Sequence, residues 1–191
     1  MDVFGHIIYP QIVRLDMAIL FIPCCSIVPL AKFKETVETP VRFASMKADV
    51  GSRAYGMMES WGSERYCAWG MTLSEGNAEV FGKLRPGDKA VFYRDDLDEP
   101  TLFCRGEVVA KELNSSYGKK LWRSYSGEGA FVYLFYLTDV YLIDSKISPN
   151  EMGFRGRDSF EDPKLYDADS HNLGNYRYLS DKMSVSGRKV C

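Results

Sequence analysis

The apolar run from Phe131 to Ile143 constrains the fold of this chain more than any other segment, because it is long enough for the longest strand of a sheet. Side chains alternate between the two faces of a strand. The run therefore predicts that Phe131, Tyr133 and Phe135 lie on one face and Tyr136 on the other.

The rest of the chain contains further strand and helix patterns. Strands are expected at 17–24, 66–71, 89–93 and 101–110, and helices at 32–38, at 76–84 and from Ser115 or Ser116 toward Trp122. Pro86 and Gly87 predict a type II turn, because proline fixes φ and glycine accepts a positive φ. Gly106 predicts a bulge or a close backbone approach in its strand. Residues 41–64 lack a regular pattern and are expected to form a long, partly ordered connection.

The composition is that of an ordinary globular domain with a tail. The 191 residues are 46% hydrophobic and 26% charged, which is enough for one good core. We expect one domain over residues 1–148 and a polar extension over 149–191, partly docked and ending as a linker. The run Met17–Pro23 is too short to cross a bilayer and reads as a buried strand.

Charge and cysteine content exclude several kinds of site. The net charge of −2 provides no overall basic footprint, so nucleic-acid binding would depend on a local patch. Five cysteines without metal-ligand spacing predict a reduced, cytoplasmic setting and no metal site. The chain has no phosphate-binding loop, and His6 and His171 lie near no plausible nucleophile. We therefore expect no catalytic residues and no cofactor.

Three tryptophans, Trp61, Trp69 and Trp122, fall in or beside predicted loops. An indole in such a place either caps a core or stacks on a flat ligand such as a base. Taken alone, each is about twice as likely to cap a core. Base stacking contributes about 1–3 kcal/mol per base, which offsets most of the unstacking that flipping requires.

The order of motifs favours the second use, because it resembles a known signature. The segment Trp69-Gly70-Met71-Thr72 is followed by Asn77, by the turn Arg85-Pro86-Gly87-Asp88 and by Val91-Phe92-Tyr93. This series is similar to the signature of EVE and YTH domains in the PUA-like superfamily. The resemblance implies an α+β fold, a PUA-like (EVE/YTH-like) bent mixed β-barrel flanked by short helices.

The segment Ala31–Val41 resembles an element that precedes EVE-like domains at the N-terminus of McrB-type, modification-dependent restriction proteins. Lys32 stands where that element usually has asparagine, which alters one candidate contact to a base.

The resemblance implies a reader that flips a modified base into an aromatic cage. Trp69 and Trp122 would form its walls, and Tyr55 or Trp61 would complete it. The implied polar contacts to the base come from Gly70, Met71, Asn77, Tyr93 and Asp95. Phosphate contacts are expected from the basic residues near Trp122 and from an extension of that cluster, namely Lys119, Lys120, Arg123, Lys83, Arg85 and Arg105. A solvated loop is an equally good interpretation of the same charges.

The ligand implied by the resemblance is methylated DNA, with N6-methyladenine favoured over 5-methylcytosine. In this interpretation the chain is the specificity domain of a McrB-type restriction system, whose AAA+ GTPase motor and nuclease would be partners. Two alternatives remain open, a PUA-like module that reads a modified RNA base and a domain that binds a small molecule or a protein.

Overall fold

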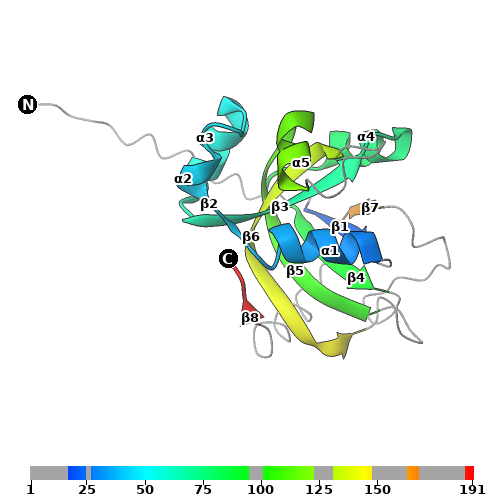
Figure 1. The fold of residues 1–191 in the computed structure, drawn as a ribbon. Helices are drawn as coiled ribbons and strands as arrows, with labels where there is room; N and C mark the ends of the chain where they lie inside the picture. Colours follow the sequence, from blue (N-terminus) through cyan, green and yellow to red (C-terminus); the bar gives the residue numbers. More distant parts are fainter. Residues whose placement is uncertain (1–16, 25–26, 95–100, 123–130, 148–162, 168–187) are drawn as a thin grey trace, which may run out of the picture.

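The structure is a computed structural model that describes residues 17–24, 27–94, 101–122, 131–147, 163–167 and 188–191. It contains eight strands and five helices among those residues (Figure 1). The strands are β1 (Ala18–Pro23), β2 (Val41–Arg42), β3 (Arg65–Thr72), β4 (Lys89–Arg94), β5 (Thr101–Leu113), β6 (Phe131–Ile147), β7 (Lys164–Asp167) and β8 (Arg188–Lys189). The helices are α1 (Ile27–Thr36), α2 (Phe43–Met46), α3 (Ser52–Trp61), α4 (Glu75–Lys83) and α5 (Ser115–Leu121).

The strands form one mixed sheet in the order β2-β3-β6-β5-β4-β1-β7, and β8 also pairs with β6. The pairs are antiparallel except for β1 and β4, which run parallel. The strand β6 is the longest of the described strands, as predicted, and it lies between β3 and β5. Three register shifts along the β5–β6 pair bend the two strands together. One of them lies at Gly106, where an added Cβ would meet Val140 Cγ2 at 2.9 Å, so the expected close approach is confirmed.

Side chains on the two faces of β3 and β6 build two hydrophobic cores. The first core contains Tyr133 and Phe135 with residues of β1, β4 and α1. The second core contains Leu134 and Tyr136 with residues of α2, α3 and α5. Phe131 belongs to the second core, so its predicted placement beside Tyr133 is wrong. The reason is a bulge: Met71 pairs with Tyr133 but Thr72 pairs with Phe131, which shifts the alternation by one residue.

Two local predictions are confirmed in atomic detail. Ser74 caps α4, because its side chain accepts a hydrogen bond from the backbone N–H of Asn77 at 3.1 Å. In the following turn Gly87 has a φ of 93°, which a type II turn requires. Asp88 fixes this turn to the sheet, since its carboxylate accepts from the backbone N–H of Arg85 at 2.7 Å and of Ala18 at 3.0 Å.

The expectation that residues 41–64 form a long, partly ordered connection without a regular pattern is wrong, because the segment forms β2, α2 and α3. Ala54 and Met58 are spaced for one helix face and are buried in the second core. Gly62 ends α3 with a φ of 69°, as a left-handed C-terminal cap does.

A polar network fastens α3 and α5 to the sheet. The carboxylate of Glu112 accepts from the backbone N–H of Gly51 at 2.8 Å and from the Tyr136 hydroxyl at 2.5 Å. Burial, followed by this hydrogen bond to Glu112, raises the pKa of Tyr136. Asn114 caps α5 by accepting from the Tyr117 N–H at 2.9 Å, and its amide donates to the Asp49 carbonyl at 2.8 Å.

Two described stretches of the predicted extension are part of the sheet. β7 pairs with β1, and β8 pairs with β6 through Tyr141 and Leu142. The final residues 188–191 are therefore paired with the sheet, contrary to the expectation of a linker there. The domain boundary at 148 stays a prediction. No helix in the described ranges has the length and apolar character needed to cross a membrane.

Candidate nucleic-acid interface

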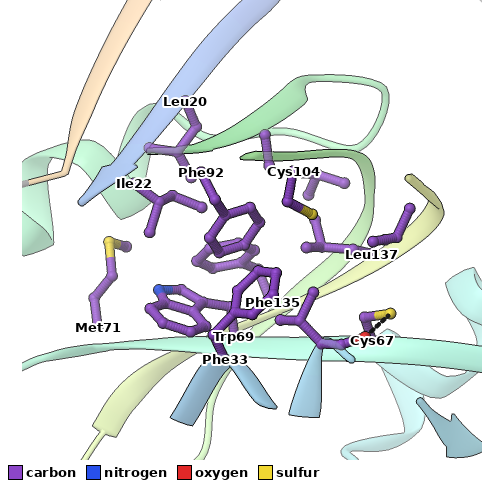
Figure 2. Packing of buried hydrophobic residues seen from close by; sticks show 14 of the residues in the cluster. Leu20, Ile22, Phe33, Cys67, Trp69, Met71, Phe92, Cys104, Phe135 and Leu137 are labelled. Atoms are coloured by element: carbon purple, nitrogen blue, oxygen red, sulfur yellow. Dashed lines mark hydrogen bonds between the residues drawn. The ribbon is translucent and has the colours of Figure 1, made fainter. Parts of the chain in front are cut away.

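Trp69 lies inside the first core. The side chain is 5% exposed on β3, and its ring meets Phe33 and Phe92 edge to face at centroid distances of 6.4 and 5.2 Å. Figure 2 shows the indole surrounded by Met71, Phe135 and these two phenylalanines. These contacts place Trp69 in the hydrophobic packing of the domain.

Trp122 follows α5 and belongs to the second core, where it is 2% exposed. It packs on Gly70, because an added Cβ at Gly70 would lie 2.9 Å from the Trp122 ring. Neighbouring residues of a strand face opposite sides, so the sheet separates Trp69 from Trp122. The prediction that these two indoles form opposing walls of one cage is wrong. Whether either of them contacts a base stays a prediction.

The two aromatic residues proposed to complete the cage lie on α3. Tyr55 stacks on Phe43 with a centroid distance of 4.3 Å and an interplanar angle of 18°, packed against the second core. Trp61 is the last residue of α3 and is 38% exposed. Tyr55 is thus a packing residue in this structure, and Trp61 is a surface residue.

The predicted polar contacts to a base are used largely for structure. Asn77 is 6% exposed, and its amide donates to the Thr72 carbonyl at 2.9 Å and to the Thr72 hydroxyl at 3.3 Å, which fastens α4 to β3. Met71 and Tyr93 are buried at 3% and 4% exposure. Asp95 lies outside the described residues.

The residues best suited to a polar ligand meet where α1, β3, the end of α5 and the start of β6 come together. We call this place the junction and define it by Lys32, Gly70, Trp122 and Phe131. The Lys32 ammonium lies 3.6 Å from the centroid of the Phe131 ring, and the Trp122 and Phe131 rings are 4.8 Å apart. Lys32 is 8% exposed and Phe131 is 9% exposed. The junction thus places a largely buried cation over the Phe131 ring, which in turn packs against the Trp122 ring.

Two hydrogen-bond donors are concentrated at the junction. Burial lowers the pKa of Lys32 to about 8, against an opposing effect of Glu35. The buried indole Nε1 of Trp122 has no hydrogen-bond partner in the described part of the chain. Lysine and indole groups donate hydrogen bonds and do not accept them. A ligand that presents acceptors therefore complements the junction. In the sequence, Lys32 is notable only because it stands where the McrB-type element usually has asparagine. Its burial depends on tertiary packing, which no local sequence pattern reveals.

The five predicted phosphate-binding residues that the structure describes do not form one cluster. Lys119 and Lys120 lie on α5, which packs on the second core, whereas Lys83 and Arg85 lie at the end of α4, which packs on the first core. Arg105 lies in β5 with its guanidinium 4.4 Å from the Tyr141 ring centroid.

Some of these charges are also partly satisfied within the protein. Lys120 is 2.5 Å from an Asp49 carboxylate oxygen, and Lys83 is 2.7 Å from Glu79 in the same helix. Arg123 lies outside the described residues. A phosphate contact at each position stays a prediction.

No family model and no curated protein matches the chain. Solved structures do match it. The N-terminal domain of Thermococcus gammatolerans McrB bound to m5C DNA superimposes with a TM-score of 0.60 at 16% identity, covering 85% of this chain and 97% of that one. A hypothetical protein from Leishmania major gives a TM-score of 0.49 at 10% identity, over 88% of this chain and 97% of the other. Human THYN1, in complex with 5-methylcytosine-containing DNA, gives a TM-score of 0.44 at 10% identity, and the match covers 86% of this chain and 98% of THYN1. The chain shares the mixed α+β fold of the McrB N-terminal domain, which confirms the predicted fold class.

Proposed function

We propose that this chain reads methylated DNA and that it binds one base, extruded from the duplex, at the junction. The observation that carries the proposal is the pair of buried donors, Lys32 and the Trp122 indole, beside the Phe131 ring. Of these two donors, the buried indole Nε1 of Trp122 has no hydrogen-bond partner among the described residues. A buried polar group of this kind is rare in proteins and calls for an explanation, of which a ligand is one. The proposal is also supported by the fold, since the McrB domain that this chain resembles is bound to m5C DNA.

The two candidate bases differ in what they present to these donors. On its pairing edge cytosine presents two adjacent acceptors, O2 and N3, beside the N4 amino donor, whereas adenine presents one acceptor, N1, beside the N6 amino donor. Two donor-only groups therefore favour 5-methylcytosine. The sequence resemblance implies N6-methyladenine, which we retain as the second candidate. In either case the methyl group is apolar, and burial against aromatic rings is favourable for it.

A titration of matched duplexes tests the proposal. We expect tighter binding of the methylated duplex than of the unmodified one, and a loss of affinity of roughly 10- to 100-fold for the methylated duplex in Lys32→Met, because a hydrogen bond to a charged group contributes about 1.5–3 kcal/mol. The measurement is fluorescence anisotropy with unmodified, 5-methylcytosine and N6-methyladenine duplexes, and with a modified single-stranded RNA as a fourth ligand. Preference for the RNA would favour the RNA-binding alternative.

Lys34→Met is the matched control, since Lys34 is an exposed residue of the same helix. It is expected to keep the preference for methylated over unmodified DNA. The affinity of the unsubstituted protein should also fall as the pH rises above about 8, where the Lys32 ammonium loses its proton, and Lys32→Met should lack this fall. Equal affinities of the two lysine variants for the methylated duplex would contradict the role of the junction.

The remaining alternative is a domain that binds a small molecule or a protein. The dependence of the binding affinity on salt concentration distinguishes it from a DNA reader. A reader that contacts two or three phosphates should lose roughly 10- to 40-fold in affinity between 50 and 200 mM salt. Lys119→Met should reduce the slope of log K against log salt by about 1 if Lys119 is one of these contacts. Binding that is insensitive to salt would favour the alternative.

We further propose that the reader serves a McrB-type restriction system, with an AAA+ GTPase motor and a nuclease as partners. We expect the chain to co-purify with both subunits. Co-purification should persist in the absence of DNA and in Lys32→Met.

A further inference from the structure

Two cysteines that are far apart in the sequence meet beside the first core. Cys67 lies in β3 and Cys191 follows β8, and their Sγ atoms are 2.9 Å apart. Figure 2 shows Cys67 at the margin of the first core. Cys67 is fully buried, whereas Cys191 is partly exposed.

The position of Cys191 is set by the backbone and does not depend on the sulfur contact. Its carbonyl accepts from the Val140 N–H at 3.0 Å, and the Val190 N–H donates to the Val140 carbonyl at 2.7 Å. Lys189 forms an ion pair of 2.8 Å with Asp139, whose φ of 47° turns β6 at this point. These contacts hold the Cys191 thiol against β3 in the folded protein.

We propose that Cys67 and Cys191 form a reversible disulfide, which covalently joins the segment after β8 to strand β3. The sulfur atoms must approach by only about 0.9 Å to reach the S–S bond length of about 2.05 Å. Neither β3 nor β8 has to unpair for this movement, because both cysteines already lie side by side.

The reaction requires an oxidant, and a low-molecular-weight disulfide such as oxidised glutathione supplies it by exchange. The Cys191 thiolate attacks one sulfur of glutathione disulfide, forms a mixed disulfide and releases one glutathione thiolate. Cys67 then loses its proton to solvent and attacks the Cys191 sulfur, which releases the second glutathione thiolate. Two electrons pass from the protein cysteines to the glutathione sulfurs, so the exchange balances.

The order of attack follows from the environment of the two thiols. The hydrogen bond between the two sulfurs lowers the pKa of Cys191, whereas the same hydrogen bond, together with burial, raises the pKa of Cys67. Cys191 is thus the more readily ionised thiol of the pair and also the more exposed residue. Cys24 and Cys104 lie in the same core and are fully buried, and burial raises the pKa of Cys104 well above its ordinary value. They are poor competitors for the oxidant.

The test is treatment of the full chain with oxidised glutathione, followed by intact mass measurement and non-reducing peptide mapping. We expect the unsubstituted protein to lose two hydrogens and to yield a Cys67–Cys191 peptide. Thermal unfolding should then shift upward by roughly 5–15 °C relative to the reduced protein, because the bond closes a long loop. Dithiothreitol should reverse both changes.

Three variants make the result specific. Cys191→Ser should neither lose hydrogens nor gain thermal stability. Cys67→Ala should stop at the mixed disulfide and retain one glutathione on Cys191. Cys104→Ala, which removes a cysteine of the same core outside the pair, should behave like the unsubstituted protein. A stable glutathione adduct on the unsubstituted protein, or a disulfide that involves Cys24 or Cys104, would overturn the proposal.

Discussion

Replacing Trp69 with alanine is expected to lower the free energy of unfolding by about 3–5 kcal/mol, because it removes a large aromatic side chain from a packed interior. The ring is 5% exposed and contacts Phe33 and Phe92, so the cavity would lie inside the first core. Urea unfolding followed by circular dichroism measures the change.

Trp61→Ala is the matched control for this substitution. Trp61 is 38% exposed at the end of α3, and its replacement is expected to change the unfolding free energy by less than about 1 kcal/mol. Equal losses in the two variants would show that Trp69 is not part of the core. A loss of DNA binding in Trp69→Ala must be interpreted with this instability in mind, which is why Lys32 is the better residue for testing the interface.

Replacing Gly118 with alanine is expected to destabilise the domain by about 3 kcal/mol or more, at the upper end of overpacking substitutions. An added Cβ would lie 2.1 Å from the Phe131 carbonyl oxygen, and a backbone atom cannot rotate away as a side chain does. The methyl group would push α5, and with it Trp122, away from β6. The same urea unfolding experiment measures this effect.

Gly56→Ala, in helix α3, is expected to stabilise the protein, in contrast to Gly118→Ala in α5. An added Cβ at Gly56 meets nothing within 4 Å, and the residue lies in the middle of α3. Alanine there should stabilise the protein by about 0.5–1 kcal/mol. If Gly118→Ala were as stable as Gly56→Ala, the close contact between α5 and β6 would be disproved.

The sequence predicted those features that short-range chemistry determines. Ser74 before α4 and Gly87 in the turn each specify a local backbone geometry, and the structure contains both. The alternation along β6 is also local, and it places Tyr133 and Phe135 together on the first core. These predictions needed no knowledge of what lies across the sheet.

The site could not be predicted in the same way, because it depends on pairing between distant strands. The bulge at Thr72 moves Phe131 to the opposite face, and only the register of β3 against β6 reveals it. The same register places Trp122 over Gly70 and away from Trp69. The motif predicted the fold correctly, but it did not reveal which side of the sheet each indole occupies.

The shared carboxylate of Glu112 has a mechanical consequence for the domain. The N-terminal backbone of α3 and the Tyr136 hydroxyl of β6 both depend on it, and Asn114, which starts α5, donates to it at 3.2 Å. Neither helix can tilt without disturbing the anchor of the other. A ligand that displaces Trp122 would therefore strain the N-terminus of α3 as well, on a part of the surface that the ligand itself does not touch.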